Sequence, residues 1–372
     1  MANLFDYITW RGDLDCKKSP LNPVDFLIFS QLSYLPFDGI VPSPEEKEEI
    51  SLQSALEIIL EKLHTTEAGF GPVLGFKEDP DFINALINSN RFGNCRLLGY
   101  VNHIDTEREI QFSALCIYTG HGDCIISFRG TDSSFVGWKE NFNMAFKEVV
   151  PSQQEAVKYL VKMFPPLKRS LHICGHSKGG NLAVYAASFC GKKMQRRITG
   201  VHSYDAPGFH ESVIKSDSYT KIKDKIYCYI PQASIIGMML EQGCRFNVVK
   251  SSQTGLMQHF LFSWEVTHND IVRAEKVNLK SRYVDKTIRE WVGKLDNEKR
   301  EQFIEGVYRI LRSSEVKSVH EMESSWPLSL GRILKSLGNI DESTRVLTLK
   351  TIAGLFRSAR NNINTLLHKE PN

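Results

Sequence analysis

The sequence has 372 residues, of which 42% are hydrophobic and 24% charged, a balance typical of a globular protein with a large core. The formal net charge of +3 is too small to indicate nucleic-acid binding, and no nucleic-acid-binding motif is present. The first residues lack the pattern of a signal peptide, and no apolar run is long enough to span a membrane. The eight cysteines form no C-x-x-C pair, which favours reduced thiols in a cytoplasmic protein without a zinc site.

Residues 1–90 are predicted to be helical. Asn22 is a good helix cap and Pro23 suits a first turn, so one helix is expected to run to about residue 35. Further helices are expected at 45–64 and from residue 79 to about residue 90. Their apolar residues fall on one face, which favours helices that cover a sheet.

Strands and helices alternate after residue 96. The apolar runs predict strands at 97–101, 109–118, 124–128, 169–174, 198–204, 225–230 and 244–249, with helices at 152–164 and 179–192. Such alternation indicates an α/β fold with a mostly parallel sheet flanked by helices on both faces. We expect a domain over residues 1–275 with its core at 96–270.

The region 276–372 is predicted to form a helical extension, because three stretches in it carry apolar residues at helical spacing. The last of these, at 342–368, has a basic polar face. A solvated face is the simplest interpretation, and contact with an acidic partner or a membrane surface is the alternative.

The sequence G-H-S-K-G-G at residues 175–180 lies between a predicted strand and a predicted helix. This is the context in which G-x-S-x-G forms a sharp turn that exposes a nucleophilic serine, here Ser177. The N–H of Lys178, at the start of the helix, would point toward the same place and could hold an oxyanion. An ordinary serine in a glycine-rich turn is the competing interpretation.

A nucleophilic serine needs a histidine base, and in α/β-hydrolases the chain order is serine, acid, histidine. Six histidines follow Ser177, at positions 202, 210, 259, 268, 320 and 368. His259 is the preferred candidate because it lies in a loop after the last clear strand. His268 is the second candidate for the base. The competing interpretation of His259 is an ordinary histidine in a surface loop.

Asp205 is the predicted acid, because it ends the strand that follows the nucleophile helix and so emerges at the same sheet edge as Ser177. Asp224 precedes its strand and would lie at the opposite edge. Asp270 follows His259 and breaks the chain order. A turn aspartate before Pro207 is the competing reading of Asp205.

The second oxyanion donor is expected at the end of a neighbouring strand, where Gly130 allows a close turn and the N–H of Thr131 is available. In the expected mechanism Ser177 attacks an acyl carbonyl, His259 accepts its proton, and water releases the acyl group. This chemistry requires no metal and no cofactor. The expected substrate is a small-molecule or lipid ester.

The sequence F-R-G-T at 128–131, followed by Trp138, resembles a segment of the class 3 (fungal-type) lipases, and G-H-S-K-G-G is similar to their nucleophile elbow. The resemblance spans about residues 96–270 and implies a lipase-like α/β-hydrolase fold with Thr131 in the oxyanion hole. The whole chain also resembles a bacterial group of lipase-like proteins known only as a domain of unknown function.

One departure from the class 3 pattern concerns the acid. Those lipases place it in a segment similar to residues 229–234, where this chain has no carboxylate. The segment 198–208, which contains Asp205, instead looks like the acid-bearing segment of pancreatic-type lipases. A Ser–His dyad is the alternative. The leading function is a serine esterase or lipase; a thioesterase or acyltransferase, or a non-catalytic scaffold, are the alternatives.

Overall fold

The computed structural model describes residues 1–277, except 66–76, 133, 145–146, 167 and 235, together with the isolated residues 298, 299, 302, 342, 346 and 350. The helical extension predicted for 276–372 therefore lies almost wholly outside the described residues. None of the helices in the described part is long and apolar enough to cross a membrane.

An eight-stranded sheet forms the centre of the molecule, with its strands in the same order as in the chain. The strands are β1 (Ile50–Ser51), β2 (Arg96–Asp105), β3 (Ile110–Tyr118), β4 (Asp123–Phe128), β5 (Ser170–His176), β6 (Ile198–Tyr204), β7 (Ile226–Pro231) and β8 (Phe246–Val249). The first four pair antiparallel, and β4 to β8 pair parallel. The predicted α/β class with a mostly parallel sheet is confirmed.

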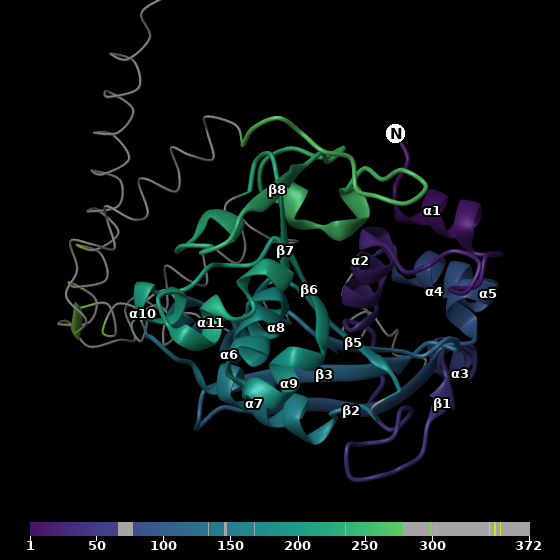
Figure 1. Ribbon diagram of the computed structural model, residues 1–372, viewed down its shortest axis with the longest axis horizontal. Coiled ribbons are helices and arrows are strands. Elements are labelled where there is room, and N and C mark those ends of the chain that lie inside the picture. The colour runs from purple at the N-terminus through teal and green to yellow at the C-terminus, as the bar shows by residue number, and fades with distance from the viewer. Residues whose placement is uncertain are drawn as a thin grey trace, which may run out of the picture.

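The N-terminal helices cover one face of this sheet. They are α1 (Leu4–Arg11), α2 (Pro23–Leu32), α3 (Leu52–Thr65), α4 (Asp79–Ile87) and α5 (Asn90–Gly93). Helix α2 crosses β4, β5 and β6 directly (Figure 1). It is buried almost all round, as expected for a helix enclosed between a sheet and other helices. The buried ion pair between Asp25 and Arg91, 2.6 Å long, joins it to α5.

The opposite face of the sheet is covered by helices that follow β4. Helices α7 (Pro151–Lys162) and α8 (Lys178–Phe189) pack there against β3 to β6 (Figure 1). The two faces bury separate clusters because alternate strand residues point in opposite directions: Leu115 and Ile117 on one side, Ala114 and Cys116 on the other. The remaining helices are α6 (Phe135–Met144), α9 (Lys192–Arg197), α10 (Glu211–Ile214) and α11 (Asp217–Thr220).

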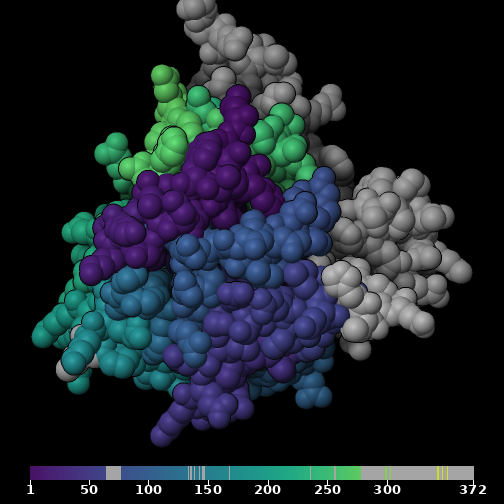
Figure 2. Space-filling model, turned by 90° about the vertical axis from the view of Figure 1, so that its right-hand side faces the viewer, coloured from purple at the N-terminus to yellow at the C-terminus, as the bar shows by residue number. Residues whose placement is uncertain are grey.

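The described residues also form four short 3-10 helices: η1 (Lys223–Lys225), η2 (Ile236–Met238), η3 (Gly255–His259) and η4 (Leu261–Ser263). The segment containing η3 and η4 returns to the N-terminus, where Phe262 stacks on Phe5 with ring centroids 5.5 Å apart and Val266 N–H donates to the Ala2 carbonyl. Figure 2 shows this segment, in green, beside the purple N-terminal helices. The N-terminal part therefore supports the loop that carries His259.

One prediction for the N-terminal part was wrong in detail. The helix expected at 45–64 begins only at Leu52, because Ile50 and Ser51 pair with Leu97 and Arg96 at the edge of the sheet. Helix α1 lies within the stretch predicted to be helical, and Asn3 and Asp6 form a capping box at its start.

Candidate active site

Ser177 occupies the sharp turn between β5 and α8, with φ 56° and ψ −131°. This left-handed conformation is strained for a residue with a side chain, and such strain is typical of a nucleophile elbow. The turn requires glycine at Gly175 and Gly179, because a Cβ at Gly179 would lie 2.0 Å from the Phe128 carbonyl oxygen. The Ser177 N–H donates to the Tyr204 carbonyl over 2.9 Å, which ties the elbow to the end of β6.

Asp205 directly follows β6 and lies beside this elbow. The parallel pairing of His176 with Tyr204 brings the ends of β5 and β6 to the same level. The Asp205 side chain is only 1% exposed and its backbone has φ 43°. Its Oδ1 accepts hydrogen bonds from the Ser234 hydroxyl, at 2.5 Å, and the Gly237 N–H, at 3.1 Å. The carboxylate is thus held firmly in one orientation.

His259 ends η3 and completes the group. Its Nδ1 lies 2.7 Å from Oδ2 of Asp205. Its ring lies 4.4 Å, centroid to centroid, from the ring of His176, the residue before Ser177. The sequence-predicted acid and base are therefore brought together beside the elbow. Within the described part of the chain, no hydrogen bond involves the Ser177 hydroxyl.

The other candidate bases and acids lie elsewhere. The reserve candidate His268 stacks on Trp10 with ring centroids 4.6 Å apart. Asp270 forms an exposed ion pair with Arg273, at 3.3 Å. Asp224 lies in η1, before β7, and therefore at the opposite sheet edge, as predicted.

Thr131 lies in the loop after β4, next to the elbow. Phe128 pairs with Gly175, and a Cβ at Gly130 would lie 2.8 Å from the His176 carbonyl oxygen. The Thr131 hydroxyl oxygen is buried and finds no hydrogen-bond partner among the residues that the structure describes. A buried polar group of this kind is available to a ligand oxygen.

The side chain of Lys178 is buried and points away from solvent. Its Nζ forms an ion pair with Glu140 of α6, at 2.9 Å, and donates to the Gln111 carbonyl at 2.6 Å. Burial lowers the pKa of Lys178, while the charge of Glu140 opposes that shift. The ion pair joins the start of α8 to the helix after the Thr131 loop, so it supports the region from which both predicted oxyanion donors come.

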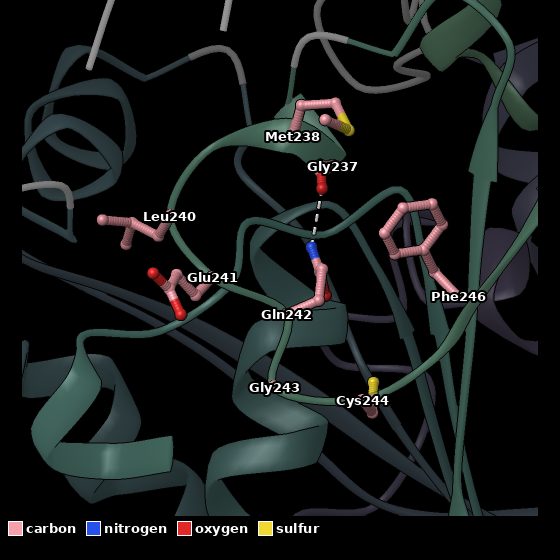
Figure 3. A pocket seen from close by; sticks show the side chains of 8 residues that line it. All are labelled: Gly237, Met238, Leu240, Glu241, Gln242, Gly243, Cys244 and Phe246. Carbon is pink, nitrogen blue, oxygen red and sulfur yellow. Dashed lines mark hydrogen bonds between the residues drawn. The ribbon is translucent and has the colours of Figure 1, made fainter. Parts of the chain in front are cut away.

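The segment between β7 and β8 holds Asp205 in place through hydrogen bonds to Oδ1, a role that the sequence did not indicate. Besides Ser234 and Gly237, it supplies Gln242, whose amide donates to the carbonyls of Gly237 and Ala206 at 2.7 and 2.8 Å. This segment lines a cavity of about 330 Å³ next to Gly237 (Figure 3). Among the described residues, no group of three or more His, Cys, Asp or Glu side chains is placed to hold a metal ion.

Comparison with known proteins gives a family and distant structural neighbours. A family model described as Mbeg1-like matches residues 86–309, which is more than half of the chain. No curated protein matches the sequence. The similar solved structures include two lipases. A crystal structure of M37 lipase is 14% identical, with TM-score 0.37 over 59% of this chain and 70% of that one. A fungal lipase–inhibitor complex is 11% identical, with TM-score 0.39 over 62% and 78%.

Proposed function

The chain belongs to the Mbeg1-like family, a lipase-like family, in agreement with the resemblance that its motifs indicated. We propose that it is a serine hydrolase that cleaves carboxylic esters through an acyl-enzyme on Ser177. The observation that carries this proposal is the 2.7 Å contact between Nδ1 of His259 and the carboxylate of Asp205, beside a strained serine elbow. A histidine held by a buried carboxylate beside a nucleophilic serine is the arrangement of a catalytic triad.

The acid and base have complementary roles in this mechanism. The N–H at Nδ1 of His259 donates a hydrogen bond to Asp205, so Nε2 carries no proton and its lone pair can act as the base. Nε2 takes the hydroxyl proton of Ser177 as the serine oxygen bonds to the ester carbonyl carbon. In a structure without substrate, this serine–histidine hydrogen bond is commonly long or misaligned and tightens when substrate binds.

The tetrahedral intermediate carries a negative oxygen that needs hydrogen-bond donors. The N–H groups of Thr131 and Lys178 are assigned this role, and the unpartnered Thr131 hydroxyl is a further donor in the same loop. The intermediate collapses when the ester C–O bond breaks and His259 returns its proton to the leaving alcohol. A water molecule, deprotonated by His259, then hydrolyses the acyl-serine and regenerates the hydroxyl of Ser177.

The test is covalent labelling with a fluorophosphonate probe, followed by intact-mass measurement and peptide mapping. We expect one adduct per chain on Ser177 and none in Ser177→Ala. Hydrolysis of a short p-nitrophenyl ester should disappear in the same variant. Ser134→Ala is a suitable control, because among the described residues this serine bonds only locally, to Asp132 in the same loop and to Gly137 in the first turn of α6. Absence of labelling in the wild type, or equal labelling in Ser177→Ala, would refute the proposal.

A further inference from the structure

Tyr34 connects the N-terminal part of the chain to the candidate active site. It lies two residues beyond the end of α2, and its hydroxyl is 2.9 Å from Nδ1 of His176. The same hydroxyl lies directly against the backbone of Gly130. A Cβ at Gly130 would lie 2.1 Å from the hydroxyl oxygen, so this close approach requires glycine. One side chain thus contacts both the elbow and the loop that carries Thr131.

His176 extends this connection to the loop that carries His259. Its Nε2 lies 2.9 Å from the backbone carbonyl oxygen of His259. A carbonyl can only accept, so Nε2 must carry the proton of the neutral His176 ring. Nδ1 is then the acceptor, and Tyr34 must donate its hydroxyl proton to it. One arrangement of protons therefore satisfies the Tyr34 hydroxyl, both ring nitrogens of His176 and the His259 carbonyl.

The environment of His176 favours this neutral form. The residue is only 3% exposed, and burial followed by the nearby His259 holds the pKa of His176 well below its ordinary value. A ring that stays neutral keeps one donor and one acceptor, which is what the carbonyl of His259 and the hydroxyl of Tyr34 require.

We propose that Tyr34 and His176 are positioning residues that keep the Thr131 loop and the His259 loop in place relative to Ser177. This inference rests on the proposed hydrolase function. Tyr34 and His176 take no part in bond making; they fix the backbone at Gly130 and at His259, on either side of the nucleophile. A catalytic geometry needs such support because a misplacement of about 1 Å can lower a rate on the order of 100-fold.

The central test is Tyr34→Phe, which keeps the ring and removes the hydroxyl. We expect kcat for a p-nitrophenyl ester, and the rate of fluorophosphonate labelling, to fall on the order of 10-fold, as for the loss of a buried hydrogen bond. KM should stay within about twofold of the wild-type value, since the substrate pocket is unchanged. Tyr159→Phe is the matched control, because Tyr159 is also buried and its hydroxyl donates to a distant carbonyl, that of Gly99, at 2.7 Å.

A second variant separates positioning from a general loss of stability. His176→Phe removes both ring nitrogens and should lower kcat at least as much as Tyr34→Phe. The double variant should be little slower than His176→Phe alone, because both changes break the same link. Thermal unfolding of Tyr34→Phe should resemble that of Tyr159→Phe. If Tyr34→Phe does not fold, His176→Phe still gives the kinetic comparison with Tyr159→Phe.

The link also has a signature that does not depend on activity. Nitrogen NMR of the His176 ring should show a protonated Nε2 and an unprotonated, hydrogen-bonded Nδ1, and the Nδ1 signal should shift in Tyr34→Phe. A protonated Nδ1, or a Tyr34→Phe labelling rate equal to that of Tyr159→Phe, would overturn the inference while leaving the hydrolase proposal intact. A wild-type chain that is not labelled on Ser177 would overturn both.

Discussion

The hydroxyl of Ser234 donates a hydrogen bond of 2.5 Å to Oδ1 of Asp205, the oxygen that does not face His259. The Gly237 N–H donates to the same oxygen. The class 3 pattern places the acid in the segment after β7. Here it supplies a donor to the proposed acid, Asp205, which stands one strand earlier. Two hydrogen bonds thereby hold Oδ1 of the carboxylate, while Oδ2 contacts Nδ1 of His259.

This arrangement predicts unequal effects at the acid and at its support. Asp205→Asn should lower kcat for a p-nitrophenyl ester by about 10³- to 10⁴-fold, because an amide cannot hold His259 in the tautomer that leaves Nε2 free. Ser234→Ala should lower kcat by about 10-fold, since it removes one of the two donors to Oδ1 of Asp205. Steady-state kinetics on the purified variants measure both effects.

Asp270→Asn is the control for the acid, because Asp270 is exposed and pairs only with nearby groups such as Arg273. It should keep turnover close to that of the wild type. A loss at Asp270 as large as that at Asp205 would mean that the acid has been assigned to the wrong carboxylate.

The closeness of Asp205 to the Ser177 elbow could be predicted because it follows from topology. Parallel strands end at one sheet edge, and Asp205 and Ser177 each follow directly on such a strand. His259 could be placed by elimination, since the chain order left few histidines in loops. The side-chain contacts themselves could not be predicted, because spacing along a chain does not say which loop folds over which.

Tyr34 and Lys178 illustrate what the sequence did not reveal. Tyr34 lies 142 positions before its partner His176, in a segment with no recognisable motif, and only the crossing of α2 over the sheet brings the two together. Lys178 was predicted to contribute through its N–H, and nothing in its neighbours indicated that its side chain is buried against Glu140. Such pairings depend on tertiary packing of elements that are distant in the chain.

The buried ion pair between Lys178 and Glu140 predicts a large stability effect. Both side chains are fully buried, so Lys178→Met should leave an uncompensated charge on Glu140 and lower the free energy of unfolding by about 3–5 kcal/mol. Glu140→Gln should also destabilise the protein. The double variant should be more stable than the sum of the two losses implies. Urea unfolding measures all three; additive losses would mean that the two charges do not interact.

The partly buried His172 and the buried His202 predict that the protein loses stability in acid. Burial lowers the pKa of His172 to about 4 and holds the pKa of His202 well below its ordinary value. In the unfolded chain these rings bind protons below about pH 6.5, whereas in the folded chain they resist protonation. The unfolded state therefore binds more protons in this range. The free energy of unfolding should fall as the pH falls from about 6.5 toward 4.

The contribution of His202 to this pH dependence can be measured separately. Its two ring nitrogens are buried and have no hydrogen-bond partner among the described residues. The ring stacks between Phe26 and Tyr227, so a phenyl ring suits the site. His202→Phe should flatten the fall in unfolding free energy between about pH 6.5 and 4. The exposed His103→Gln variant serves as control, and an unchanged slope in His202→Phe would contradict the assignment.

The close contact between α8 and β4 predicts that replacing Gly179 lowers both stability and reactivity. An alanine Cβ there would lie 2.0 Å from the Phe128 carbonyl oxygen, a backbone atom that cannot move aside without shifting β4 or α8. Gly179→Ala should therefore lower the free energy of unfolding by about 1–3 kcal/mol or more. It should also slow fluorophosphonate labelling on the order of 10-fold, because α8 carries the Lys178 N–H toward the oxyanion. Gly120→Ala, where an added Cβ meets no atom within 4 Å, should change neither quantity appreciably. Equal behaviour of the two variants in urea unfolding and labelling would show that the elbow tolerates a wider gap between α8 and β4.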